Sequence, residues 1–217
     1  MRLLRLSLLC VLSIVSTACS NEGNKKMKLN HDATSGLDIT IAHSPDPAFL
    51  FVADPDSYEG FVSSDWTIDS LWSHVTEQMN SERIAAWGTP EQDLKIRIIV
   101  RDGYIIEPPT PEFAAATSFY VQSGGRLCFG SYTHITMSAQ FPEEHIDAES
   151  NYHPDYSQHL LTVRPARYRI DVYRHFGWRE GSQHAEQLNK GVNFTIVISN
   201  HPTGDKISHY DIPWTTR

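Results

Sequence analysis

The alternation of apolar and polar residues is clearest between Pro165 and Phe176. Tyr168, Ile170 and Val172 fall on one side of an extended chain, because successive side chains of a β-strand point to opposite faces. The residues between them are mostly charged and fall on the other side. The pattern predicts a principal strand whose apolar face packs against other strands and whose polar face points outward.

Shorter runs of the same kind recur along the chain and are separated by turns rich in glycine, proline and aspartate, which is typical of a β protein. Some alternate, and others are continuously apolar, as expected for strands buried on both faces. The runs are Leu37–Ala42, Ala48–Ala53, Leu94–Arg101, Thr117–Gln122, Arg126–Tyr132, His134–Met137, His159–Arg164 and Val192–Ser199.

One segment, at about 66–80, has helical periodicity instead. Its apolar residues recur at spacings of three and four, which places them on one face of a helix. Asp65 stands where an N-cap would be expected. With the strands, this predicts a mainly β fold: β-sandwich-like antiparallel sheets with one amphipathic helix. The apolar helix positions are Ile68, Leu71, Trp72, Val75 and Met79.

The first twenty residues resemble a bacterial lipoprotein precursor. Arg2 and Arg5 precede an apolar run that is too short to span a bilayer, and small residues then lead to Cys19. Ser16 departs from the family pattern, which has an aliphatic residue at this position. The resemblance implies a signal peptide at 1–18 and acyl chains on Cys19. A plain secretory signal or an uncleaved anchor are the alternatives.

The residues after the cysteine extend this expectation. Residues 19–36 are polar and suggest a flexible tether, which leaves 37–217 as a single β-rich globular domain. Because residue 20 is serine rather than aspartate, the family rule implies the outer membrane, with the domain facing the periplasm. Two or more acyl chains give stable anchoring, whereas one gives only marginal binding.

Charge and cysteine usage narrow the function classes. Removal of Arg2 and Arg5 lowers Lys and Arg from 18 to 16 against 26 Asp and Glu, for a net charge of about −10 with His neutral. Such an acidic surface argues against nucleic acid as a partner. Cys128 is the one cysteine left beyond the signal and Cys19, so no intramolecular disulfide is expected, and a buried, inert thiol is predicted.

Histidines are frequent, with 11 in the chain, and a loop at 145–159 carries three of them among carboxylates. Imidazole and carboxylate together suit zinc and other transition metals, so His145, His153 and His159 are weak candidate metal ligands. Their spacing fits no helix or strand pair, and a polar surface loop explains them equally. We therefore expect no cofactor.

The outward face of the Pro165–Phe176 strand is a second candidate site. Arg167, Arg169, Tyr173 and His175 would share it and form a basic set on an acidic protein. Such a set could bind an anionic group or an acidic protein partner. Asp171 lies on the same face and could neutralise Arg169, in which case the face is a solvated strand surface with ion pairs.

Several short motifs resemble the competence protein J family of small β-rich bacterial proteins. They are His43-Ser44 at a strand end, a Trp-bearing helix, Trp87-Gly88 before a strand, the segment 119–131 and Pro165-x-x-Tyr168, which together span 37–175. The family commonly has glycine where Arg167 stands. At least one member inhibits a nuclease by binding it, so the resemblance implies a binding role and no catalytic residues.

The sequence favours a lipid-anchored cell-envelope protein that acts as a non-catalytic binding or inhibitor module, of the immunity type. It carries neither a G-x-S-x-G elbow nor a P-loop. Two alternatives remain: a metal-assisted hydrolase that uses the 145–159 loop, and a structural envelope lipoprotein.

Overall fold

The computed structural model describes residues 29–43, 48–103, 112–146, 159–179, 182, 184, 185, 188, 190–201 and 203–215. The predicted signal peptide, the lipidation site Cys19 and His153 of the candidate metal loop lie outside these residues. The elements are β1 (Leu29–Asp32), β2 (Leu37–His43), β3 (Ala48–Ala53), α1 (Ile68–Asn80), β4 (Ile84–Thr89), β5 (Leu94–Arg101), β6 (Ala115–Ser123), β7 (Arg126–Ser131), α2 (Tyr132–Gln140), β8 (His159–Thr162), β9 (Ala166–Arg174) and β10 (Phe194–Asn200).

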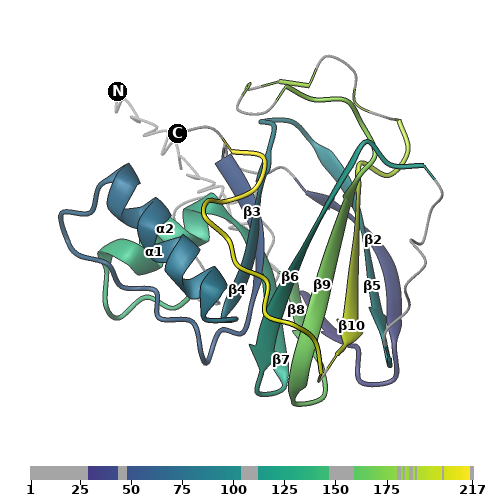
Figure 1. Cartoon of the computed structure of the whole chain (residues 1–217), viewed down its shortest axis with the longest axis horizontal. Helices are drawn as coiled ribbons and strands as arrows, with labels where there is room; N and C mark the ends of the chain where they lie inside the picture. Colours follow the sequence, from purple (N-terminus) through teal and green to yellow (C-terminus); the bar gives the residue numbers. More distant parts are fainter. Residues whose placement is uncertain are drawn as a thin grey trace, which may run out of the picture.

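The strands form two five-stranded sheets, so the mainly β prediction is confirmed. Sheet A has the order β1-β8-β7-β3-β4, and sheet B has the order β2-β5-β10-β9-β6. Both helices lie beside sheet A, on the left in Figure 1, and sheet B lies on the right. The predicted principal strand, β9, pairs with β10 on one side and with β6 on the other.

The sheets are mixed rather than purely antiparallel, which corrects part of the prediction. Most pairings are antiparallel, but β1 runs parallel to β8 and β5 runs parallel to β10. Local alternation of side chains cannot reveal strand direction, because it is the same in both kinds of sheet. β1 also lies within the range predicted as tether, so residues 29–32 belong to sheet A.

Helix α1 matches the predicted helix, but it begins two residues later than an Asp65 cap would place it. Thr67 is the N-cap: its hydroxyl accepts a hydrogen bond from the Ser70 backbone N–H at 3.2 Å. The Ser70 hydroxyl oxygen in turn accepts from the Thr67 backbone N–H at 2.8 Å. This reciprocal pair satisfies two backbone donors that the helix leaves open.

The segment at His134–Met137, predicted as a strand, is helical and belongs to α2. Ile135 and Ala139 are fully buried on one face of this helix, at a spacing of four. The segment is too short for its pattern to separate a strand from a helix, and the choice is made by packing against sheet A. No helix in the described part of the chain is long and apolar enough to cross a membrane.

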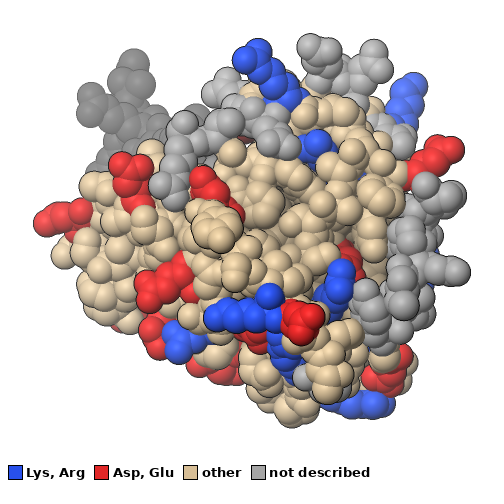
Figure 2. Space-filling model, in the orientation of Figure 1, with Lys and Arg blue, Asp and Glu red and all other residues tan. Residues whose placement is uncertain are grey.

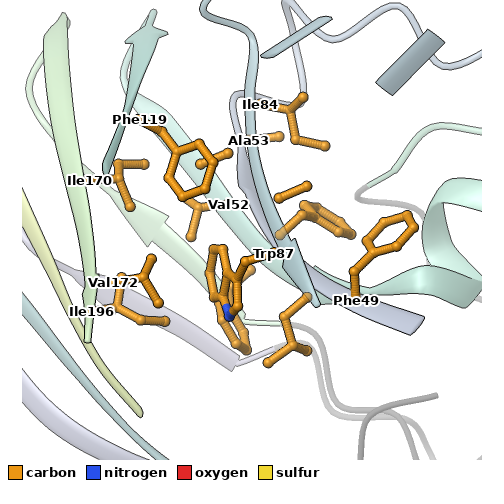
Figure 3. Packing of buried hydrophobic residues seen from close by; sticks show 14 of the residues in the cluster. Phe49, Val52, Ala53, Ile84, Trp87, Phe119, Ile170, Val172 and Ile196 are labelled. Atoms are coloured by element: carbon orange, nitrogen blue, oxygen red, sulfur yellow. The ribbon is translucent and has the colours of Figure 1, made fainter. Parts of the chain in front are cut away.

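The core lies between the two sheets, with Trp87 at its centre (Figure 3). Trp87 extends from β4, is fully buried, and has its ring 6.2 Å from Phe119 of sheet B and 6.4 Å from Phe129 of sheet A. Ile170 of β9 also points into this layer, as its alternation predicted. Cys128 is fully buried, as expected from the sequence.

The segment after β10 crosses the front of the molecule (yellow in Figure 1) and closes one side of the core. Pro213 accepts a hydrogen bond from the Gly88 backbone N–H at 2.8 Å. Trp214 adopts a positive φ of 65° and stacks on Phe194 with ring centroids 6.2 Å apart. The guanidinium of Arg174, buried on the core side of β9, lies 5.0 Å from the Trp214 ring centroid, a cation–π distance.

Candidate functional site

Three of the four residues predicted to share one face of β9 do so, namely Arg167, Arg169 and Tyr173, and that face is the outward face of sheet B; His175 comes directly after the end of the strand. Core-facing Tyr168, Ile170 and Val172 alternate with these three along the strand. Each of the four, however, contacts other parts of the chain, and the contacts divide them into two groups at opposite ends of β9.

Arg167 is the most firmly held of the four. Its Nε and Nη2 donate to the two carboxylate oxygens of Glu82, both at 2.7 Å, and its Nη1 donates to the Gly204 carbonyl at 2.9 Å. The guanidinium also lies 3.7 Å from the centroid of the Tyr120 ring. These hydrogen bonds lower the pKa of Glu82 below its usual value. Arg167 therefore fixes the C-terminal segment to the sheet.

Arg169 is neutralised within its own strand, as the sequence suggested. Its Nε donates to the Asp171 carboxylate at 2.8 Å, and its Nη2 lies 3.1 Å from the Ser118 hydroxyl oxygen. Ser118 donates to the same carboxylate at 2.5 Å. Acidic and basic side chains also lie next to one another in the lower part of Figure 2. Much of the predicted basic set is thus compensated locally.

Tyr173 and His175 form the second group, at the other end of β9. The Tyr173 ring meets Phe113 edge to face, with centroids 5.2 Å apart. His175 Nδ1 lies 3.1 Å from the Glu112 carbonyl and therefore acts as a donor, which leaves Nε2 to accept from the Thr195 hydroxyl at 2.8 Å. Thr195 is 1% exposed, whereas the His175 ring is half-buried, so the hydroxyl is available only to the imidazole.

A polar pocket of about 710 Å³ opens next to the first group, and we call it the C-terminal pocket. It is lined by Tyr120 of β6, Arg169 of β9, His201 and the segment 203–207. Gly204 is essential to its shape, because a Cβ atom there would lie 2.0 Å from the Tyr120 hydroxyl. Thr203 and Lys206 are exposed at this site. Its lining offers hydroxyl, imidazole, guanidinium and ammonium groups, together with the carboxylate of Asp205.

Sequence reasoning identified Arg169 of this pocket but missed Tyr120, His201 and Lys206. Tyr120 lies opposite Arg169 across the β6–β9 pairing. His201 follows directly after β10, and its backbone N–H donates to the Arg167 carbonyl at 2.9 Å. Lys206 lies in a segment whose local pattern predicts no structure, and the contact of Arg167 with Gly204 helps to hold that segment at the pocket. No local signal in the sequence indicates that these residues converge.

The candidate metal ligands occupy different environments. His145 is exposed in the turn after α2. His159 is 2% exposed in β8, with its Nδ1 3.2 Å from Nε2 of His31. No group of three or more metal-binding side chains is found among the residues that the structure describes.

Comparisons with known proteins place the chain in no family. No family model matches the sequence, and no curated protein matches it. Two solved structures show weak similarity. A protein titled "Crocagin biosynthetic gene J" has a TM-score of 0.48 and 14% identity, over 76% of this chain and 97% of its own.

The second structure is ComJ from Bacillus subtilis, titled an inhibitor of the DNA degrading activity of NucA. It has a TM-score of 0.40 and 9% identity, over 74% of this chain and 92% of its own. The resemblance to the competence protein J family therefore has a weak structural counterpart. At these scores neither similarity assigns a function, and the molecule is defined by its own features: a mainly β protein of two packed mixed sheets with a polar pocket on sheet B.

Proposed function

We propose that this protein is a lipid-anchored cell-envelope protein that acts as a non-catalytic binding module, with the C-terminal pocket as its contact for a protein partner. The observation that carries the proposal is the way the pocket is built. Its floor is a paired sheet, through Tyr120 and Arg169, and its wall is a segment held in place by Arg167. Such a preorganised polar site loses little conformational freedom when a partner binds.

The chemistry of the pocket favours binding over catalysis. Arg169 is engaged by Asp171, and Arg167 by Glu82, so both guanidinium groups serve to hold the site together. Lys206 extends from the segment at the rim and is exposed. A partner would meet hydrogen-bonding groups in fixed positions, which gives specificity more than affinity.

Site-specific photo-cross-linking tests this contact. A photoreactive residue at Thr203 is compared with one at Glu77, which is exposed on α1. We expect a discrete cross-linked product in envelope preparations from the Thr203 position, reduced by Lys206→Glu, and none from the Glu77 position. Equal products from both positions, or none from Thr203, would contradict the proposal.

The anchor is tested separately, by metabolic labelling with palmitate. Cys19 is expected to carry the label, so Cys19→Ala should abolish it and release the protein from the membrane fraction. Label retained by the Cys19→Ala variant would remove the anchor from the proposal and leave the pocket untouched.

The finer form of the proposal is inhibition of an enzyme that acts in the envelope, as an immunity protein does. It is motivated by the tether and by the acidic charge of the chain. If it holds, the product cross-linked at Thr203 contains an enzyme, and Lys206→Glu weakens inhibition of that enzyme in the same proportion as cross-linking. Cross-linking to an enzyme whose activity is unchanged would reject the inhibitory role alone.

A further inference from the structure

Two histidines join the first strand to its neighbour. His31 of β1 and His159 of β8 have Nε2 and Nδ1 3.2 Å apart, and their rings are stacked with centroids 5.5 Å apart. β1 is an edge strand of four residues, paired with β8 alone among the described strands. A strand this short has few backbone hydrogen bonds, so its side-chain contacts contribute much of its attachment.

A third histidine, His43 of β2, lies in the same region. It is 3% exposed and meets the Phe129 ring edge-on at 5.5 Å, and His159 meets the same ring at 6.3 Å. Within the described part of the chain, neither ring nitrogen of His43 has a hydrogen-bond partner, and neither does Nε2 of His159. Burial without a partner requires a neutral imidazole, because a buried charge needs compensation.

The ionisable groups that act on these rings all carry positive charge when protonated. His159 is influenced by His31, and His43 by His159 and by His134 of α2. Among the residues that the structure describes, no carboxylate is a cause of the pKa shift of either ring. Burial is the larger cause and lowers the pKa of His43 to about 3 and that of His159 to about 4.

We propose that the His31–His159 contact is an acid-sensitive latch that holds β1 on the edge of sheet A and opens when the pH falls. In the latched state His159 must stay neutral, whereas after release it is solvated and can take up a proton. The released state therefore binds more protons, and acid favours it. The latch is fully closed above about pH 6.5, the ordinary value for histidine, and weakens progressively below it.

The release would change how far the domain reaches. β1 follows the N-terminal part of the chain directly, and residues 29–36 would join that part as extended chain. At about 3.3 Å per residue, these residues would add roughly 26 Å. The change in reach depends on the proposed anchor, but the latch itself does not.

Hydrogen–deuterium exchange on the full chain tests the latch. The readout is the protection factor of the backbone amides of 29–33, relative to those of β9, at pH 7 and pH 5. One histidine that ionises only after release changes the equilibrium constant for release of β1 about 25-fold between pH 7 and pH 5. In wild type we expect the protection factors of 29–33, and of no other segment, to fall by about this factor when the pH is lowered from 7 to 5. The double variant His31→Phe/His159→Phe, which can stack but cannot titrate, should abolish this loss of protection.

Two further variants keep the test decisive. His145→Phe removes an exposed histidine outside the cluster and should behave like wild type. His159→Phe alone removes the imidazole that takes up a proton after release, so it should abolish the loss of protection, and it serves if the double variant does not fold. Unchanged protection in wild type, a loss of wild-type size in His159→Phe, or an equal loss in β9 would each overturn the latch.

Discussion

Glu82 and Arg167 meet through two parallel hydrogen bonds of 2.7 Å, although they lie 85 residues apart in the chain. Glu82 has a positive φ of 59° in the turn between α1 and β4, and Arg167 lies at the start of β9 on sheet B. Their side chains are 22% and 15% exposed. A residue first noticed as a possible partner contact is therefore a cross-link between the helix–strand turn, sheet B and the C-terminal segment.

Replacing Glu82 tests this cross-link. Glu82→Gln should lower the free energy of unfolding by about 1–3 kcal/mol at pH 7, because it leaves a partly buried guanidinium without its anion. Because the folded state lowers the pKa of Glu82, its stabilisation is present above the ordinary value of 4.5 and is lost as the pH falls through the lowered value. Urea unfolding at pH 7 and pH 3 measures both effects. Glu77→Gln on the exposed face of α1 is the control, and equal stability of the two variants at pH 7 would refute the cross-link.

Gly88 should not tolerate a side chain. A Cβ atom there would lie 2.3 Å from the Trp214 carbonyl oxygen, so Gly88→Ala should displace the C-terminal segment at a cost of about 1–3 kcal/mol. Gly177→Ala is the matched control, because a Cβ atom at Gly177 meets nothing within 4 Å. Thermal unfolding of the two variants gives the comparison. A Gly88→Ala protein as stable as Gly177→Ala would show that the segment is not held in this way.

The helix cap offers a choice between two residues. Thr67→Ala should destabilise the protein by about 1 kcal/mol, because the Ser70 N–H loses its acceptor. Asp65→Ala should change the stability little, because Asp65 lies two residues before the cap and is exposed. Chemical unfolding measures the loss of stability in both variants. A larger loss in Asp65→Ala than in Thr67→Ala would indicate that Asp65 is the N-cap, as the sequence predicted.

His43 should make the protein sensitive to acid. Its folded-state pKa of about 3 lies below the ordinary 6.5, so it contributes no penalty above pH 6.5 and destabilises the fold as the pH falls from 6.5 towards 3. The slope from this residue is about 1.4 kcal/mol per pH unit. His43→Leu should flatten the dependence of unfolding free energy on pH in this range by that amount. A slope that is unchanged in the variant would show that His43 does not ionise on unfolding in this range.

Much of the fold could be predicted because strands and helices leave local periodicities in the sequence. The alternation of Tyr168, Ile170 and Val172 placed β9 correctly, and helical spacing located α1. The four-residue pattern at His134–Met137 could not separate a strand from a helix, and α2 forms there because Ile135 and Ala139 pack on sheet A. Strand direction was equally inaccessible, since pleating is the same in parallel and antiparallel pairs.

For the candidate site, too, one part could be predicted from the sequence and another part depended on the tertiary structure. The sequence by itself determined which side chains share the outward face of β9, because a period of two follows from the geometry of one strand. Only the tertiary structure decided what those side chains do. Glu82 binds Arg167, Ser118 of β6 joins the Arg169–Asp171 pair, and the segment 203–207 completes the pocket. The physical reason is that these contacts join residues far apart in the chain, and their geometry depends on how two sheets pack rather than on any local preference of the backbone.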